Sequence, residues 1–182
     1  MRRHIVAVVV AVLLTFTGRS GWGGVQYTVT DLGTLGGTQS EAYGINNSGQ
    51  IVGLSYASSG FLNAFFYSGG AMQDLGTLGG NISYANAINA SGQVVGGSAI
   101  SGNSTRHAFL YSGGSMQDLG TLGGTWSIAW AINASGQIAG ESFPSGRTTS
   151  HAFLYSGGSM QDLGTLGGTW SVVHWESKRG RS

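Results

Sequence analysis

The chain of 182 residues has no cysteine, one proline and few charged side chains, which make up 8% of the sequence. Ordinary globular domains carry about 25% charged residues. Without cysteine, no disulfide can link the elements of the fold. The 34 glycines also disfavour helices, because each costs a helix interior about 1 kcal/mol relative to alanine. The composition therefore favours a β structure.

Basic residues are scarce in the central part of the chain. Between positions 25 and 175 the only ones are Arg106 and Arg147. The carboxylates in the same stretch are Asp31, Glu41, Asp74, Asp118, Glu141 and Asp162. A nucleic-acid surface needs a basic stripe that contacts phosphates. We therefore expect no nucleic-acid partner.

The N-terminus combines a short basic segment, Met1–His4, with an apolar segment, Ile5–Thr17. This order is typical of a secretory signal peptide. The apolar segment is shorter than the ~20 residues that cross a bilayer. We predict a signal peptide at 1–20, a secreted, extracellular or periplasmic protein, and no stable membrane span after cleavage. An uncleaved anchor is the alternative.

The motif Asp-Leu-Gly-Thr-Leu-Gly-Gly dominates the rest of the chain. Its copies occupy Asp31–Gly37, Asp74–Gly80, Asp118–Gly124 and Asp162–Gly168. Their starts are 43, 44 and 44 residues apart (74 − 31, 118 − 74, 162 − 118), a period that indicates a repeat architecture. The segments 107–127 and 151–171 are identical. The predicted organisation is a lone strand at 25–37, units at about 38–80, 81–124 and 125–168, and a divergent tail at 172–182.

One unit reads as four short strands separated by Gly, Ser and Asn, which are turn residues. The predicted strands are Met72–Leu78, Ser83–Asn89, Gln93–Ser98 and His107–Tyr111, with Gly79-Gly80 ending the first of them. Ala90-Ser91-Gly92 is typical of a tight hairpin. Four strands in about 44 residues match a β-propeller blade. The predicted fold is all-β, with tandem four-stranded repeats forming part of a propeller; a three-fold β-trefoil or β-prism is the alternative.

The chain resembles the HAF-repeat family of predicted extracellular bacterial proteins over about Tyr27 to Ser171. The resemblance rests on His107-Ala108-Phe109, on its copy at His151–Phe153 and on the Asp-Leu-Gly-Thr-Leu-Gly-Gly motif. It also rests on the Ile-Asn-x-Ser-Gly-Gln turns at Ile45–Gln50, Ile88–Gln93 and Ile132–Gln137. The resemblance implies export and a propeller-like repeat fold. It implies no activity, substrate or catalytic residue.

Recurrent polar residues are the first candidates for a site. The motif aspartates supply one carboxylate per unit, whereas calcium needs six to eight oxygen ligands. We therefore expect each aspartate to hydrogen-bond the backbone beside its glycine turn. His107 and His151 are too few for a zinc site, which needs three or four ligands. No catalytic residue, cofactor or metal is predicted.

Aromatic residues are the second group of candidates. Trp126 and Trp170 follow Gly-Gly-Thr at the same position of two units and are candidate ligand-contact residues. The alternative is that they pack between neighbouring units. Trp130 is expected in the core. The variable loops at 56–62, 99–106 and 141–150 are expected on one rim, where binding loops commonly lie.

The resulting expectation is a secreted, non-catalytic β-repeat protein that serves as an extracellular or cell-surface interaction module. Its partner would be an extracellular glycan or protein, and open sheet edges would allow self-association. One alternative is a propeller-type glycosidase or lyase. Another is a truncated repeat protein without independent function.

Overall fold

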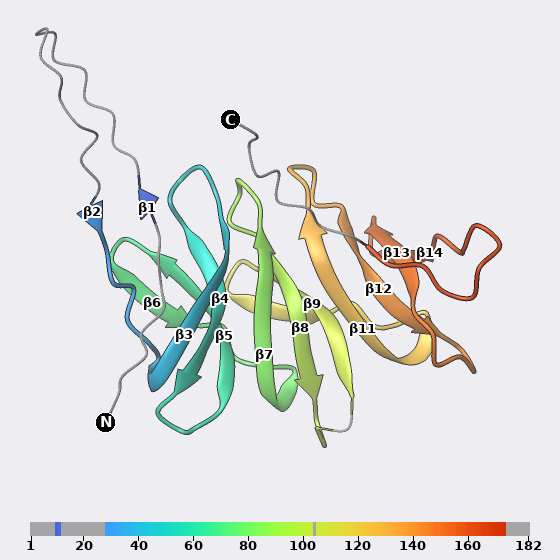
Figure 1. Ribbon diagram of the computed structural model, residues 1–182, viewed down its shortest axis with the longest axis horizontal. Helices are drawn as coiled ribbons and strands as arrows, with labels where there is room; N and C mark the ends of the chain where they lie inside the picture. Colours follow the sequence, from blue (N-terminus) through green and yellow to red (C-terminus); the bar gives the residue numbers. More distant parts are fainter. Residues whose placement is uncertain (1–9, 12–27, 104, 174–182) are drawn as a thin grey trace, which may run out of the picture.

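The computed structural model describes residues 10–11, 28–103 and 105–173, and all regular structure within these ranges is β-strand (Figure 1). The prediction of an all-β protein is therefore confirmed. The predicted signal peptide lies outside the described residues, except that Val10–Ala11 forms β1, which pairs antiparallel with β2 (Thr28–Val29). The predicted tail lies outside them after Val173.

The chain forms three successive four-stranded antiparallel meanders. The first contains β3 (Gly36–Ile45), β4 (Ile51–Ala57), β5 (Leu62–Ser68) and β6 (Ala71–Asp74). The second contains β7 (Gly79–Ile88), β8 (Val94–Ile100), β9 (Arg106–Ser112) and β10 (Ser115–Asp118). The third contains β11 (Gly123–Ile132), β12 (Ile138–Pro144), β13 (His151–Ser156) and β14 (Ser159–Asp162). Each meander starts two residues before the predicted unit boundary.

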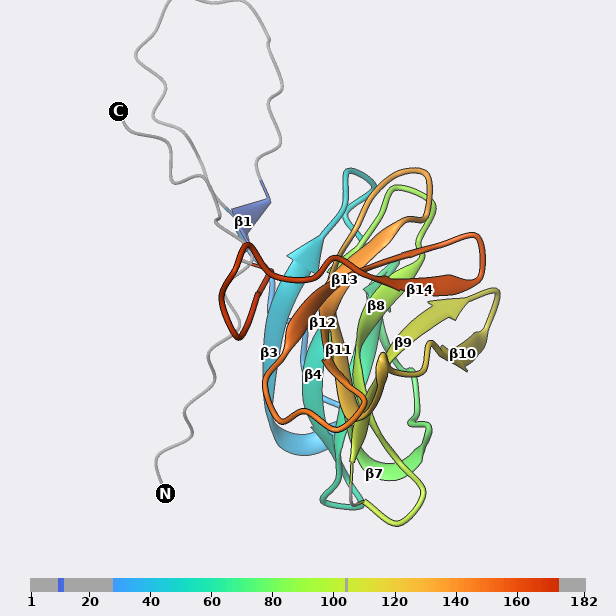
Figure 2. The ribbon, with the colours of Figure 1, turned by 90° about the vertical axis from the view of Figure 1, so that its right-hand side faces the viewer.

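The first two meanders join into one eight-stranded sheet through a single parallel pair, Leu62 with Ile82. The third meander is a separate four-stranded sheet. Figure 1 shows β3, β7 and β11, which we call the first strands, side by side on the face toward the viewer. The turned view in Figure 2 places β3 on one side of the molecule and β10 and β14 on the other.

A hairpin turn joins the first two strands of each meander, and asparagine organises it. In the second meander, Asn89 Oδ1 accepts hydrogen bonds from the backbone N–H groups of Ser91 and Gln93. Gly92 has φ +78°, a left-handed conformation that glycine adopts without steric cost. This turn confirms the predicted hairpin.

The same asparagines link the three meanders. Asn46 Nδ2 donates to the carbonyl oxygen of Asn89, 2.9 Å away. Asn89 Nδ2 donates in turn to the carbonyl oxygen of Asn133, 3.1 Å away. Residues 43 or 44 apart in the sequence therefore become neighbours, and the repeat period appears as a ladder of hydrogen bonds.

The apolar core lies mainly between consecutive meanders. Phe109 belongs to a cluster that also contains Val52 of the first meander, and Phe153 to one that contains Val95 of the second. The phenylalanine of each His-Ala-Phe or Asn-Ala-Phe triplet, namely Phe65, Phe109 and Phe153, is fully buried. Burying one such side chain stabilises the fold by about 1.5–3 kcal/mol. A meander therefore depends on its neighbour for much of its core.

The predicted strand Met72–Leu78 is wrong in extent. The strand β6 ends at Asp74, and Gly79-Gly80 begins β7 instead of ending a strand. Asp74 Oδ1 accepts a hydrogen bond from the N–H of Gly76, whose φ is +75°, and the chain turns there. The predicted lone strand at 25–37 is likewise interrupted, since only Thr28–Val29 is a strand before β3 begins at Gly36.

The connections separate into two groups at opposite ends of the strands. The Asn-x-Ser-Gly hairpins lie along the upper edge in Figure 1. The β4–β5, β8–β9 and β12–β13 connections, which carry the variable loops, lie along the lower edge. The variable segments therefore share one edge of the molecule, as the repeat pattern predicts.

Candidate binding site: an aromatic cleft on the first strands

Each first strand carries a β-bulge at the same position. On β3 the register steps from Ala42 opposite Gly53 to Gly44 opposite Val52, which leaves Tyr43 as the extra residue. The equivalent shifts lie between Ala85 and Ala87 on β7 and between Ala129 and Ala131 on β11. The bulged residues are Tyr43, Asn86 and Trp130. A bulge redirects its side chain and is common next to functional sites.

A glycine on the second strand makes each bulge sterically feasible. A Cβ atom at Gly140 would collide with the carbonyl oxygen of Ile128. Gly53 and Gly96 meet the equivalent carbonyl oxygens, those of Glu41 and Tyr84. Glycine is required at these positions because the backbones of the two strands approach each other closely. Neither a turn nor a positive φ is present there.

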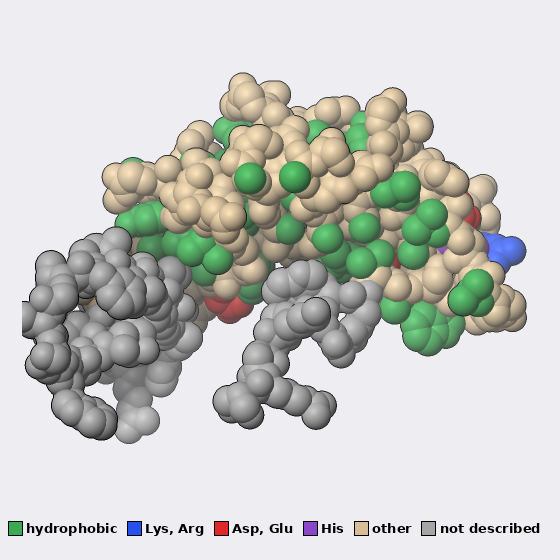
Figure 3. Space-filling model, turned by 90° about the horizontal axis from the view of Figure 1, so that it is seen from above, with side chains coloured by type: hydrophobic (Ala, Val, Ile, Leu, Met, Phe, Trp, Pro, Cys, Tyr) green, Lys and Arg blue, Asp and Glu red, His purple; other side chains and the backbone are tan. Residues whose placement is uncertain are grey.

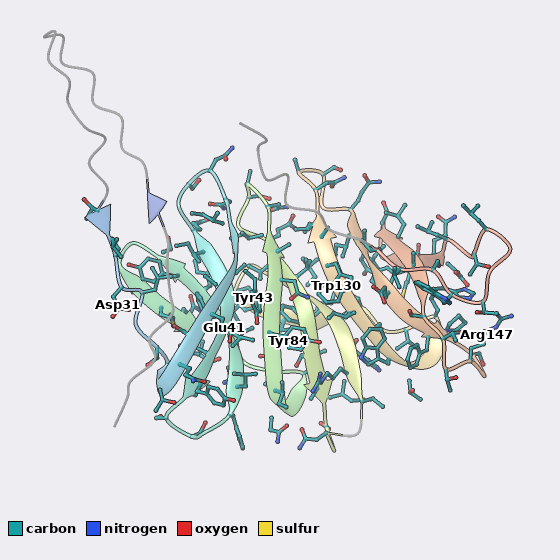
Figure 4. The ribbon with its side chains drawn as sticks, viewed as in Figure 1. Asp31, Glu41, Tyr43, Tyr84, Trp130 and Arg147 are labelled. Atoms are coloured by element: carbon teal, nitrogen blue, oxygen red, sulfur yellow. The ribbon has the colours of Figure 1, made fainter. Side chains whose placement is uncertain are left out.

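The side chains of the first strands line an open cleft of about 430 Å³. We call it the aromatic cleft, and it is lined by Tyr43, Tyr84, Asn86, Ile128 and Trp130. Figure 4 shows Tyr43, Tyr84 and Trp130 across the face formed by β3, β7 and β11. The expectation that Trp130 belongs to the core is wrong, because the bulge directs it to this cleft and leaves it only partly buried.

Hydrogen bonds to neighbouring groups hold the polar atoms of the cleft. The Tyr43 hydroxyl donates to Glu41 Oε2 at 2.8 Å. Trp130 Nε1 donates to Glu141 Oε1 at 3.1 Å. Asn86 Nδ2 donates to the carbonyl oxygen of Ala129 at 2.8 Å. Two carboxylates therefore lie beside the aromatic rings.

The surroundings raise the pKa values of both tyrosines of the cleft. Burial, together with the hydrogen bond to Glu41 and its charge, raises the pKa of Tyr43 to about 12. Burial also raises the pKa of Tyr84, against the opposing effect of Arg106. The Arg106 Cζ atom lies 5.9 Å from the centre of the Tyr84 ring, within the range of a cation–π contact.

Charged side chains are sparse on the face of the molecule that is seen from above. The view from above in Figure 3 shows mostly uncharged polar and hydrophobic atoms, with few Lys, Arg, Asp or Glu side chains. Glu41 and Glu141, from the first and third meanders, each place a carboxylate beside one aromatic side chain of the cleft.

The prediction for the motif aspartates is confirmed. Asp31, Asp74, Asp118 and Asp162 each accept a hydrogen bond through Oδ1 from the glycine N–H two residues later, at 2.7–2.9 Å. These contacts stabilise the turn that precedes β3 and the turns that follow the fourth strands β6, β10 and β14. No group of three or more His, Cys, Asp or Glu suited to a metal ion occurs within residues 28–103 and 105–173.

The structure also pairs the aspartates with the histidines, which the sequence analysis missed. His107 Nδ1 lies 2.8 Å from Asp118 Oδ2, and His151 Nδ1 lies 2.9 Å from Asp162 Oδ2. In the first meander Asn63 Nδ2 donates to Asp74 at 2.7 Å. In every meander the two paired residues are 11 positions apart, and this constant separation is the feature of the sequence that indicates the pairing. Each pair joins the third and fourth strands of a meander.

Neither of the two candidate tryptophans is among the residues that line the cleft. Trp126, in β11, is partly buried against Phe143 of β12, with ring centres 5.2 Å apart. Its packing partner is therefore in its own meander, not in a neighbouring one. Trp170 follows β14 and is 61% exposed. Their role as ligand contacts stays a prediction.

Within the described residues no helix has the length and apolar character of a membrane span. Comparisons of the chain with protein-family models, with curated proteins and with solved structures found no match in any of the three. The resemblance to the HAF-repeat family stays a prediction, and the candidate site rests on geometry alone.

The sequence contains one signal for the cleft. The bulged residue is the variable position in the otherwise similar segments Ala-Tyr-Gly-Ile-Asn, Ala-Asn-Ala-Ile-Asn and Ala-Trp-Ala-Ile-Asn. Alternation along a strand does not reveal which residue is the extra one in a bulge. Only the pairing of the first and second strands identifies it.

Proposed function

We propose that this chain is a secreted, non-catalytic interaction module, built as part of a β-propeller, that binds its ligand in the aromatic cleft. Three four-stranded meanders with matching registers support the propeller arrangement. The resemblance noted in the sequence and the basic, apolar N-terminus support secretion. The expected partner is an extracellular glycan or protein.

One observation carries the choice of site. The three meanders share nearly all of their turn and core residues, yet the bulged position holds Tyr43, Asn86 and Trp130. Residues required by a repeated backbone recur in every unit, whereas a ligand is contacted by a single asymmetric set. The bulges bring this set together in a cavity of a size that suits small ligands or the tip of a larger one.

The test is a binding screen of the full chain against soluble glycans and extracellular proteins, repeated with Trp130→Ala. We expect the substitution to weaken binding by about tenfold or more, because tryptophan is enriched among the residues that carry most of the binding energy at interfaces. Trp126→Ala and Trp170→Ala are the matched controls and should retain binding. Loss of binding in these controls, with Trp130→Ala unaffected, would assign the site to Trp126 and Trp170.

The enzymatic alternative is tested on the same ligands. Glu41 and Glu141 are the carboxylates beside the cleft, but each is hydrogen-bonded to an aromatic residue. We expect no cleavage product from any bound glycan after prolonged incubation. Product that disappears in Glu41→Gln or Glu141→Gln would identify a glycosidase or lyase instead.

Self-association through open sheet edges is a separate part of the proposal. The strands β3 and β14 are at the ends of their sheets. Ile45, the last residue of β3, is 58% exposed, and Leu166, four residues after β14, is fully exposed. We expect light scattering to show an oligomer whose mass increases with concentration. A monomer at all concentrations would contradict self-association and leave the cleft proposal intact.

A further inference from the structure

The groups around the aromatic cleft form a donor-poor, acceptor-rich site. Tyr43 donates to Glu41, Trp130 to Glu141, and Asn86 to a backbone carbonyl, while Glu141 also accepts from Ser150. The Tyr84 hydroxyl and the second N–H of Asn86 are the side-chain donors of the lining that donate no further hydrogen bond within the described residues. The aromatic ring faces and the carboxylate oxygens remain as attractive groups. A neutral polyol could donate its hydroxyls to the carboxylates, but it would gain neither charge attraction nor a cation–π contact there.

The charges near the cleft favour a positively charged ligand. Glu41 and Glu141 contribute two negative charges, and Arg106, over the Tyr84 ring, contributes one positive charge. A cation gains from the carboxylates by Coulomb attraction and from the rings of tryptophan and tyrosine by their quadrupoles. It needs no hydrogen-bond donor from the protein.

The apolar lining adds a second requirement. Ile128 and the ring surfaces of Tyr84 and Trp130 offer mainly hydrophobic contact. A bare ammonium ion would keep its water shell in preference to such contacts, whereas an alkylated ammonium group carries methyl groups that match them. The cavity of about 430 Å³ is within the range of small-molecule sites.

We propose that the aromatic cleft binds a small organic cation with an alkylated ammonium group, of which choline is the simplest probe. This inference rests on the proposed function, because it names the ligand chemistry of the same site. Tyr43, Tyr84 and Trp130 would surround the alkylated nitrogen, and Glu41 and Glu141 would balance its charge.

The experiment compares three probes by isothermal titration with the full chain at neutral pH. Choline carries the positive charge, 3,3-dimethylbutan-1-ol has the same shape without charge, and glycine betaine adds a carboxylate. We expect the neutral analogue to bind about tenfold more weakly than choline, since it lacks the cation–π attraction. Betaine should also bind more weakly, because its carboxylate would approach Glu41 and Glu141.

Variants then locate the site. Trp130→Ala should abolish choline binding, and Trp130→Phe should retain a weaker affinity, because phenylalanine keeps a ring of lower cation affinity. Glu41→Gln should weaken choline binding and leave the neutral analogue unchanged. Circular dichroism of each variant verifies the fold, and Trp126→Ala, which should bind as the parent does, is the matched control.

The outcomes separate this inference from the proposed function. Equal affinity for choline and the neutral analogue would overturn the inference, because burial of apolar surface alone would then explain binding. Glycan binding that depends on Trp130, without choline binding, would overturn it while leaving the proposed function in place. Absence of any ligand that depends on Trp130 would overturn both.

Discussion

The segments 107–127 and 151–171 have identical sequences but different environments. In both, the aspartate accepts from the glycine N–H two residues later at 2.7 Å, and the histidine pairs with that aspartate. Ser127 Oγ and Ser171 Oγ donate to the carbonyl oxygens of Gly120 and Gly164 at 2.6 and 2.7 Å. The turn is therefore a local property of these residues.

The two segments differ where a neighbouring meander is needed. Leu119 is 7% exposed because it packs in a cluster with Ile138 and Phe153 of the third meander, whereas its counterpart Leu163 is 55% exposed. Residues 123–127 belong to β11, but 167–171 form no strand. In the described part of the chain, no strand pairs with 167–171 as β12 pairs with β11. Because the two segments have the same sequence, the presence of a pairing strand decides whether this segment forms a β-strand.

The largest expected effect comes from the two leucines. Leu119→Ala should reduce the free energy of unfolding by about 2–5 kcal/mol, because it leaves a cavity between meanders. Leu163→Ala should change it by less than about 0.5 kcal/mol, because the side chain is already largely exposed. Urea denaturation followed by circular dichroism measures both. Equal losses of unfolding free energy in the two variants would show that Leu163 is buried in solution.

The two serines should give a smaller difference. Ser127 is fully buried, and its Oγ accepts from the N–H of Ala108 at 2.8 Å. Ser127→Ala should cost about 1–3 kcal/mol, because that buried N–H loses its partner. Ser171→Ala removes the same contact to Ala152 in a partly buried site, where water can replace it. If both serine variants lost similar amounts of unfolding free energy in the same denaturation experiment, the proposed difference between their environments would be contradicted.

The smallest effect concerns acid stability at Asp162. Burial raises its pKa, but hydrogen bonds from Gly164 and His151 outweigh this effect and hold the pKa below its usual value. A lowered pKa in the folded state stabilises the fold above the pKa of the unfolded chain, and this contribution is lost as the pH falls through the folded-state pKa. Asp162→Asn should therefore flatten the decline in stability on acidification. An unchanged pH profile would contradict a role for this carboxylate.

Much of the architecture was predictable because the signals are local. Gly92 and its repeat equivalents mark the hairpins, and the short β-prone segments mark the second and third strands of each meander. The predicted strand Met72–Leu78 was wrong because it continued through a turn that Asp74 and Gly76 impose. A side chain that hydrogen-bonds its own backbone overrides the strand pattern there.

The candidate site was not predictable in the same way. The position of Trp130 in the middle of a strand predicts a core residue. The positions of Trp126 and Trp170 beside glycine turns predict exposed aromatic side chains. The cleft depends on a bulge at three equivalent positions, and a bulge exists only in the pairing of two strands. The glycines at 53, 96 and 140 permit that pairing, but their purpose is visible only when the opposing carbonyl oxygens are in place.

The sequence by itself determined the all-β character, the repeat period and the Asp–Gly turns, because these depend on residue conformation and on contacts within a few positions. Tertiary structure decided which copies of the motif become strands and which side chains meet in the cleft. The physical reason is that strand pairing and burial need a neighbour. The same leucine of the motif is 7% exposed at 119, where a neighbouring meander covers it, and 55% exposed at 163.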